Sequence, residues 1–424
     1  MSMVLLGTAI AVLLLLRVPV AFALLGPCLT YVSFEGYSAG LSVRQATEAV
    51  NSFPLLAVPL FILVGVVANR AGIADRLFDF ALAAVGRVRG SLAYVNIGVS
   101  VGFSWMSGSA LADAAGLGKV EIPVMKRNGY PPRFAVGVTA ASSLLGPVMP
   151  PSIPAVVYAG IAGVSTGALF AASVAPAFLM AAGLAIMVFF LVRRRDDLRG
   201  EPFSWANLRR TGVRVIGPAG APVIILGGIL GGWFTPTEAA AVGAAYVLVL
   251  GAVYGRITWR DLFPIAKETA ATTASITLIV GASGLLGWIL ARERVPQAIS
   301  EALLGLTDNA IVFLLLVNVL LILLGAILEG VSALVITVPI LLPIAAEFGV
   351  DPMHFGVIVI MNLMIGLLTP PIGAVLFVMS PVARMPIHEV FRGTLPFLLP
   401  LLVVLLLVTF VPSIVTFLPE LLGL

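Results

Sequence analysis

The chain has 424 residues, of which 60% are hydrophobic and 10% are charged, and its mean hydropathy is +1.13. This composition excludes a soluble globular domain, and many apolar windows reach the roughly 20 residues that a helix needs to cross a bilayer. The single cysteine, Cys28, excludes an internal disulfide framework, and two histidines argue against a histidine-built metal or general-base site. We therefore predict an all-α polytopic membrane protein, since apolar helices of this length satisfy their own backbone hydrogen bonds inside a bilayer.

Taken in order, the chain begins with an apolar stretch that lacks a basic segment before it, so we expect a retained first helix rather than a signal peptide. A polar loop follows over 33–51. The stretch 72–90 carries its apolar and charged residues mostly on opposite faces, which is typical of an amphipathic helix in the membrane interface. The uninterrupted apolar stretches are predicted as helices over 3–30, 53–69, 167–192, 215–233, 235–255, 268–291 and 394–418.

Two apolar stretches of the first half are interrupted in the middle. Residues 91–127 form two arms around Ser107-Gly108-Ser109, and each arm is short for a full crossing. They predict a re-entrant hairpin whose ends lie on one membrane side. Residues 133–165 are interpreted as a crossing helix broken near Gly146 and Pro150-Pro151. Proline removes a backbone donor and clashes with the preceding turn, so two adjacent prolines open the helix.

The second half repeats these glycine and proline positions. Pro123, Gly129, Pro132, Gly146, Pro150 and Pro151 recur 220 residues later as Pro343, Gly349, Pro352, Gly366, Pro370 and Pro371. The pattern predicts a second hairpin over 309–347, with its tip near Leu328-Glu329-Gly330, and a second broken helix over 353–382. Interrupted apolar segments at corresponding places in two halves indicate a transporter that binds its cargo where those segments meet.

Charge predicts the orientation. Seven Lys and Arg residues lie between Arg193 and Arg214, so this loop is expected to be cytoplasmic. Counting crossings then places the base of the first hairpin inside and the acidic base of the second hairpin outside. We expect an inverted repeat, with the first residues cytoplasmic and the last residues periplasmic. Its parts are a first repeat over 1–212, a linking helix over 213–234 and a second repeat over 235–424.

The two helix breaks are candidate cation sites. An opened helix exposes carbonyl oxygens, which suit a hard cation such as Na⁺. Symmetry then gives two sets of residues. The first site is predicted at Ser104, Ser107, Gly146 and Met149, and the second at Gly325, Gly366, Thr369 and Ile372.

A carboxylate substrate is expected between the two hairpin tips. Hydroxyl and amide groups, together with helix N-termini, orient an anion without an ion pair too tight to release. The alternative for any single serine is close helix packing, which also favours small residues in membranes. The candidate donors are Ser107, Ser109, Ser142, Ser143, Ser332, Asn362 and Thr369.

Several charged residues in apolar surroundings leave alternatives open. Asp113 is costly at membrane depth, so it either gates or binds, or it caps or pairs to hold the hairpin. The proline pairs at the two breaks are grouped with it as gating or structural residues. Glu329 at the second tip is interpreted as a cap rather than a gate. Glu238 fits a capping box with Thr235, and Lys119 is expected to pair with Glu121.

At these motifs the chain resembles the large membrane subunit of tripartite ATP-independent periplasmic (TRAP) transporters. The resemblance implies an elevator-type secondary transporter of the bacterial inner membrane, with a small four-helix membrane subunit and a separate periplasmic solute-binding protein. It also implies Na⁺-driven uptake of an organic acid such as a C4-dicarboxylate or sialic acid, with cation sites on the residues named above. The resembling stretches are FPLLAVPLFILVG (53–65), SGSALADAAGLG (107–118), GYPPRFAVGVTAASSLLGPVMPPSIP (129–154), FTPTEAAAVGA (234–244) and GLLTPPIGA (366–374).

Three other functions compete with this interpretation. One is a stand-alone Na⁺- or H⁺-coupled anion symporter of the same fold that needs no binding protein. A membrane-embedded enzyme would need a catalytic constellation that two histidines and one cysteine do not offer. A passive channel has no use for an inverted pair of hairpins. We also expect no organic cofactor, because no nucleotide-binding motif is present.

Overall fold

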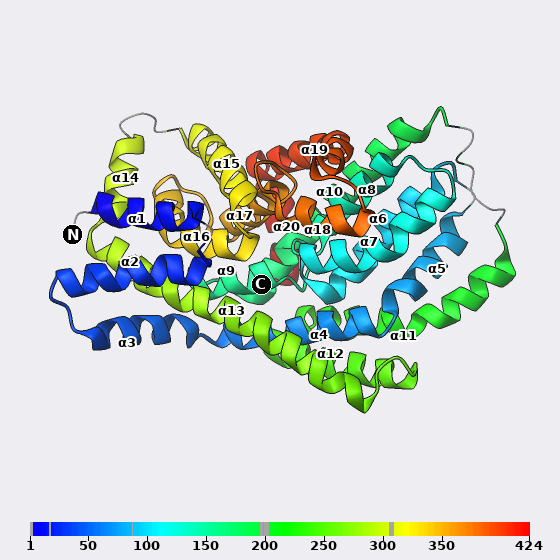
Figure 1. The fold of residues 1–424 in the computed structure, drawn as a ribbon, viewed down its shortest axis with the longest axis horizontal. Helices are drawn as coiled ribbons and strands as arrows, with labels where there is room; N and C mark the ends of the chain where they lie inside the picture. The colour runs from blue at the N-terminus through cyan, green and yellow to red at the C-terminus, as the bar shows by residue number, and fades with distance from the viewer. Residues whose placement is uncertain (1–2, 17, 87, 196–197, 199–202, 305–308) are drawn as a thin grey trace.

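The computed structural model describes residues 3–16, 18–86, 88–195, 198, 203–304 and 309–424. Within these ranges the chain forms helices and no strand (Figure 1). The first half contains α1 (Met3–Leu15), α2 (Val20–Phe34), α3 (Ala39–Val50), η1 (Phe53–Leu56), α4 (Ala57–Arg70), α5 (Ile73–Val85), α6 (Ser91–Ser107), α7 (Ala110–Arg127), α8 (Pro132–Ser142), η2 (Ser143–Leu145), α9 (Ile153–Ala162) and α10 (Thr166–Val192). The second half contains α11 (Trp205–Leu230), α12 (Pro236–Val253), α13 (Trp259–Arg292), α14 (Val295–Leu304), α15 (Ala310–Ile327), α16 (Gly330–Glu347), α17 (Pro352–Gly366), α18 (Ala374–Ala383), α19 (Ile387–Phe410) and α20 (Ser413–Leu422).

Eight helical segments in the described part of the chain are long and apolar enough to cross a membrane. They are η1 with α4, α10, α11, α12, α13, α15, α16 and α19. The predicted all-α membrane fold is therefore confirmed. The helix predicted over 215–233 begins earlier, at Trp205, and the one predicted over 268–291 begins at Trp259. In both cases charged residues extend the helix beyond its apolar part.

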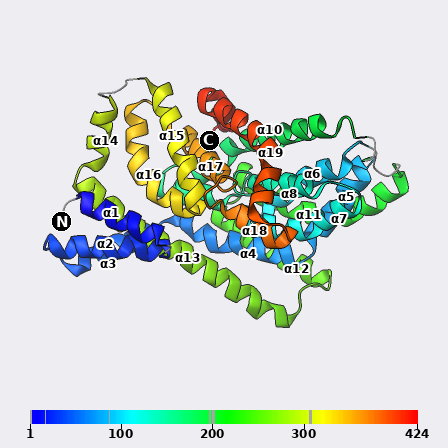
Figure 2. The same cartoon turned by 45° about the horizontal axis from the view of Figure 1, so that its top comes forward.

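Both predicted hairpins are present. The first consists of α6 and α7, which meet at Gly108, where φ is +61°. The second consists of α15 and α16, which meet at Leu328 and Glu329. In Figures 1 and 2 the first hairpin lies on the right of the molecule and the second on the left. The two hairpins thus lie apart, and the inverted orientation of one relative to the membrane stays a prediction.

Both predicted helix breaks are present as well. Residues 146–152 leave the helix between η2 and α9, and residues 367–373 leave it between α17 and α18. Each break contains a cis peptide bond, Pro150-Pro151 in the first and Pro370-Pro371 in the second. Two breaks of the same construction, each beside a hairpin, confirm that the repeat found in the sequence is a repeat of structure.

Three predicted elements were wrong. The first helix, expected over 3–30, is two short helices, α1 ending at Leu15 and α2 beginning after Pro19. Proline lacks an amide hydrogen and disfavours helical geometry in the residue before it, which favours a break at this point. The loop expected over 33–51 contains α3, which packs against α13 so closely that a Cβ on Gly284 would lie 2.2 Å from the Cβ of Ala49. The last helix, expected over 394–418, begins at Ile387 and divides at Pro412 into α19 and α20.

Local predictions about charged residues have mixed outcomes. Thr235 and Glu238 form the expected capping box at the start of α12. Glu329 caps α16, since its carboxylate accepts a hydrogen bond of 3.1 Å from the amide of Ser332. The expected pairing of Lys119 with Glu121 is wrong. Lys119 is exposed, whereas Glu121 is fully buried and accepts a hydrogen bond from Asn96.

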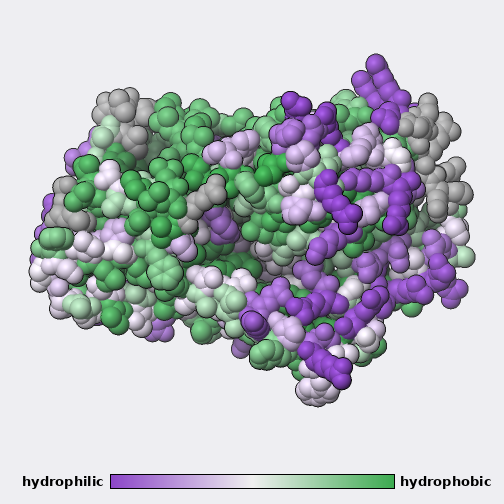
Figure 3. Space-filling view, in the orientation of Figure 1, coloured by the Kyte–Doolittle hydropathy of each residue, from purple (hydrophilic) through white to green (hydrophobic). Residues whose placement is uncertain are grey.

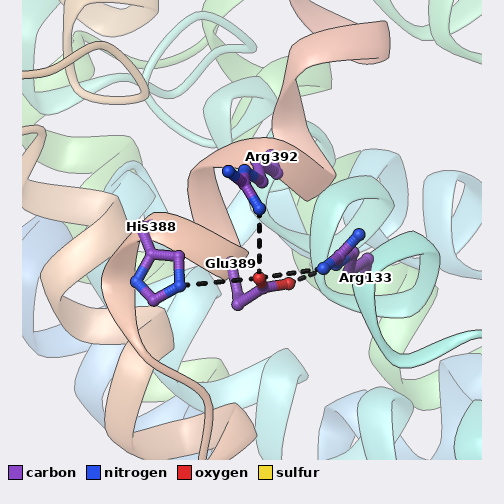
Figure 4. Close-up of polar contacts among 4 residues, drawn as sticks. All are labelled: Arg133, His388, Glu389 and Arg392. Carbon is purple, nitrogen blue, oxygen red and sulfur yellow. Dashed lines mark hydrogen bonds and ion pairs between the residues drawn. The ribbon is translucent and has the colours of Figure 1, made fainter.

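A cluster of charges joins the start of α8 to the start of α19 (Figure 4). Arg133 donates to both carboxylate oxygens of Glu389, one of them at 2.8 Å. His388 and Arg392 each lie 3.5 Å from the same carboxylate. Beyond the cluster the two helices touch through backbone, because a Cβ on Gly137 would lie 2.0 Å from the carbonyl oxygen of Gly393. We infer that α8 and α19 behave as one packed unit.

The surface is uneven in polarity. Figure 3 shows hydrophilic residues concentrated on the right half of this face, the side on which the first hairpin lies, and hydrophobic residues on the left. The pattern agrees with the charge asymmetry of the sequence. The membrane side on which each terminus lies stays a prediction.

Candidate functional site

A cavity of about 520 Å³ lies between the two hairpin tips. The first tip contributes Ser107, Gly108 and Ser109, and the second contributes Glu329 and Ser332. The opposite wall comes from α4 and α13, which contribute Asn69, Glu268, Thr272 and Ser275 among others. The two breaks border the cavity through Pro147 and Leu367. Hairpin tips and helix breaks therefore meet at one hollow, as the repeat predicted.

The first tip is held against α4 by close backbone contact. A Cβ on Gly65 would lie 3.1 Å from the carbonyl oxygen of Ser107, so glycine permits the approach. Ser109 is the N-cap of α7, and its hydroxyl accepts a hydrogen bond of 3.4 Å from the amide of Ala112. The turn places Ser107 and Ser109 in the cavity wall.

Three buried oxygens, from Asp113 and Ser107, converge beside the first break. A Cβ on Gly146 would lie 2.4 Å from Oδ2 of Asp113 and 3.4 Å from Oγ of Ser107. Asp113 is fully buried, the Ser107 hydroxyl faces its carboxylate, and among the described residues none of the three oxygens makes a hydrogen bond of ordinary geometry. Buried polar atoms are almost always well paired, so a carboxylate with only one weak neighbour is a candidate place for a ligand. A buried cluster of oxygens that includes a carboxylate suits a hard cation.

This geometry bears on the alternatives left open for Asp113. The carboxylate makes no ion pair with any residue that the structure describes, and Ser109 rather than Asp113 caps the helix. The other members of the first predicted cation set are Ser104, one turn before Ser107 on α6, and Met149, in the break after Gly146. Ser104 donates its hydroxyl to the carbonyl of Val101 at 2.7 Å, which leaves the oxygen lone pairs available. Met149 is fully buried within the break.

The second predicted cation set is also brought together. A Cβ on Gly366 would lie 2.6 Å from the carbonyl carbon of Gly325, so the tip and the broken helix touch through backbone. The amide of Ile372 donates to the carbonyl of Ala326 at 3.0 Å. The Thr369 hydroxyl donates to the carbonyl of Ile365 at 3.2 Å, which keeps the side chain at the break.

The predicted substrate donors divide into two groups. Ser107, Ser109 and Ser332 line the cavity, but the other four do not. Ser142 donates to Asn96 at 2.8 Å, Ser143 to the carbonyl of Ala140 at 2.8 Å, and Asn362 to Asn318 at 2.7 Å. Thr369 is described above. Ser142 and Asn362 thus bond to a neighbouring helix, whereas Ser143 and Thr369 bond to a carbonyl one turn back, and the sequence pattern could not reveal either outcome.

The wall formed by α4 and α13 was missed from the sequence. Glu268 accepts a hydrogen bond of 2.8 Å from Arg70, so its charge is balanced by a neighbour. Thr272, Ser275, Ile276 and Ile279 follow one another at the spacing of a single helix face, and all four line the cavity. That spacing is the signal that could have identified the face.

Comparison with known proteins gives the same assignment over nearly the whole length. Residues 8–414 match the family model described as "Tripartite ATP-independent periplasmic transporter, DctM component". The sialic acid TRAP transporter large permease protein SiaM of Vibrio cholerae is 44% identical, over 96% of both chains. The C4-dicarboxylate TRAP transporter large permease protein DctM of Pseudomonas aeruginosa is 38% identical, over 94% of both.

A solved structure resembles the fold at low sequence identity. The YdaH transporter of Alcanivorax borkumensis, whose structure is described as having an unusual topology, superposes with a TM-score of 0.62 at 18% identity. The match covers 87% of this chain and 86% of that one. At this identity the match shows a shared transporter fold alone. The full-length family match, together with two hairpins and two broken helices around one cavity, shows that this chain belongs to the DctM family, the large permease subunits of TRAP transporters.

Proposed function

We propose that this chain imports an organic acid across the bacterial inner membrane, coupled to Na⁺, together with a small four-helix membrane subunit and a periplasmic solute-binding protein. The observation that carries the proposal is the convergence of the buried Asp113 carboxylate, which has no basic partner among the described residues, and the Ser107 hydroxyl on Gly146, beside the cavity between the tips. A cation bound there lies next to the cargo, so each favours binding of the other. Relatives named as sialic acid and C4-dicarboxylate permeases support an organic acid as the cargo.

The electrostatics of the cavity favour an anion near the first tip. The N-termini of α7 and α9 are capped by the neutral side chains of Ser109 and Ser152. The N-terminus of α16 is capped by the carboxylate of Glu329. This negative side chain already occupies the helix end that would otherwise attract an anion. We therefore place the substrate carboxylate beside Ser107 and Ser109. A C4-dicarboxylate or a related carboxylate remains the proposed class.

An elevator motion accounts for the way the cavity wall is divided. One side consists of tips and breaks, which also hold the proposed cation sites, and the other side consists of α4 and α13. Movement of the first set against the second carries the cavity across the membrane without dismantling either cation site. In this proposal the first residues are cytoplasmic and the last are periplasmic.

The cation sites can be tested separately at the two breaks. We expect Ser107→Ala and Thr369→Ala to raise the Na⁺ concentration needed for half-maximal uptake, because each removes one hydroxyl from a predicted site. Both variants should insert and melt like the wild type, since each loses a single small polar group. An unchanged Na⁺ titration in both variants would remove these residues from the cation sites.

Uptake into proteoliposomes tests the proposal as a whole. The chain is reconstituted with its small subunit, with and without the binding protein and with and without an inward Na⁺ gradient. Labelled organic acids of different size and charge are screened. We expect uptake only when both the binding protein and Na⁺ are present. Uptake without the binding protein would identify a stand-alone symporter, and proton-driven uptake without Na⁺ would reject the two Na⁺ sites.

A further inference from the structure

A second buried carboxyl group lies in the first hairpin, away from the cavity. Glu121, on α7, is fully buried and belongs to a set of polar side chains from α6 and α8 that is also buried. Asn96 donates both hydrogens of its amide, to Oε2 of Glu121 at 2.5 Å and to the hydroxyl of Thr139 at 2.6 Å. Ser142 donates to Oδ1 of Asn96 at 2.8 Å, and Ser100 donates to Ser142 at 2.9 Å. None of these residues lines the cavity.

The hydrogens of this network are fully used, and none reaches the second oxygen of Glu121. Asn96 has no further amide hydrogen, and the Thr139 hydroxyl donates to the carbonyl of Ala135 at 2.9 Å. Oε1 of Glu121 therefore has no hydrogen-bonding partner among the described residues. An ionised carboxylate left half-satisfied in a membrane interior is strongly unfavourable unless a cation or a proton neutralises it.

The neighbouring basic side chains are engaged elsewhere. On α7 itself, Lys119 is exposed and Lys126 donates to the carbonyl of Ala383 at 2.8 Å. Arg133 at the start of α8 pairs with Glu389, and Arg76 on α5 lies over the ring of Tyr254 at 3.4 Å. No salt bridge to Glu121 occurs in the part of the chain that the structure describes. The charged group that acts electrostatically on Glu121 is Asp113 on the same helix, which is also acidic and repels a second negative charge. The charge of Glu121 therefore has no protein counterion among the described residues.

The repeat shows that the carboxyl group is not needed to build a hairpin. The pair Asn96 and Ser142 recurs in the second half as Asn318 and Asn362, which are also hydrogen-bonded to each other, at 2.7 Å. The position 220 residues after Glu121 is Leu341, which is buried against the same kind of surface. An apolar side chain thus suffices there for packing. The acid in the first half has a role that packing does not explain.

We propose that Glu121 is a proton-binding site of the first hairpin, separate from both Na⁺ sites, and that it carries a proton in the conformation described here. A proton needs one oxygen, and Oε1 is available. A Na⁺ ion needs several oxygens at once, whereas the donors and acceptors around Glu121 are already bonded to one another. The neutral carboxylic acid removes the charge from the membrane interior and leaves the hydrogen bond from Asn96 in place.

Infrared spectroscopy of the purified complex in lipid tests this site without any uptake assay. The carbonyl stretch of a protonated carboxylic acid is resolved from that of a carboxylate, so the wild type minus Glu121→Gln spectrum isolates the group. We expect an acid band in the wild type at neutral pH that is missing from Glu121→Gln. The band should be retained in Glu329→Gln, the matched control, because Glu329 lies at the cavity and outside the network.

Two further measurements could contradict the proposal. Glu121→Leu copies the repeat-related residue Leu341, so it serves if the glutamine variant does not fold, and it must lose the same band. Removal of Na⁺ should leave the band unchanged. A band that grows when Na⁺ is removed would show that Na⁺ displaces the proton and that Glu121 is a Na⁺ ligand. A wild-type spectrum that differs from both Glu121 variants by a carboxylate band, with no difference in the acid carbonyl band, would show an ionised carboxylate and overturn the proposal.

Discussion

Gly146→Ala probes the first cation site more sharply than removal of any ligand. A Cβ at this position would lie 2.4 Å from Oδ2 of Asp113 and 3.2 Å from its carboxyl carbon. An ordinary carbon–oxygen contact is about 3.4 Å, so the carboxylate must retreat by about 1 Å, and overpacking of this size costs about 1–3 kcal/mol. If the whole cost weakens cation binding, the Na⁺ concentration needed for half-maximal uptake rises about 5- to 150-fold, because each 1.4 kcal/mol changes the affinity tenfold.

The assay is a Na⁺ titration of organic acid uptake in the reconstituted complex. Gly98→Ala is the matched control, because it lies in α6 of the same hairpin and a Cβ there meets nothing within 4 Å. We expect the control to titrate like the wild type. The reasoning fails if Gly146→Ala folds, melts within a few degrees of the wild type and shows a Na⁺ midpoint within twofold of it.

Three further predictions concern the cavity, the packing and the orientation. Ser109→Ala should raise the KM for the organic acid several-fold in uptake assays, because Ser109 lines the cavity. Ser143→Ala should leave KM unchanged, because Ser143 is bonded to its own helix. Equal effects of the two substitutions would contradict the proposed position of the substrate. Gly137→Ala should lower the melting temperature, since a Cβ there collides with the backbone of α19 at a cost of about 1–3 kcal/mol, and an unchanged melting curve would argue against this packing. Cysteine labels at positions Arg195 and Asp351 should react from opposite membrane sides, and reaction from one side would remove the inverted orientation.

The sequence was most informative where the constraint on the backbone is local. Adjacent prolines and a preceding glycine interrupt a helix wherever they occur, so both breaks could be located, and Ser107-Gly108-Ser109 located the first tip. The same rule applied at Pro19 and Pro412, but the strongly apolar stretches around them concealed it. Helix α3 was hidden for the opposite reason, because its polar composition favours a loop until α13 is available to cover its apolar face.

The candidate site could be predicted only in part. Glycines and hydroxyls at the breaks were proposed from repeat symmetry, and the structure places Ser107 beside Gly146 and Gly325 against Gly366. The direction in which a side chain points depends on neighbouring helices, so Ser142 and Asn362 could not be told apart from cavity residues such as Ser109. The wall from α4 and α13 lies far away in the chain. Only the packing of α13 against α4 brings Glu268 and Thr272 opposite the tips.

The most direct test of Na⁺ coupling is the ratio of Na⁺ to organic acid that enters the same proteoliposomes. Both fluxes are followed together with radiolabelled Na⁺ and labelled acid, with the small subunit and the binding protein present. Two repeat-related cation sites predict at least two Na⁺ for each acid. With a monoanion this moves net positive charge inward, so an inside-negative potential accelerates uptake, by roughly 2.3 kcal/mol of driving force per charge for 100 mV. Acid uptake that continues with no accompanying Na⁺ entry would contradict the account.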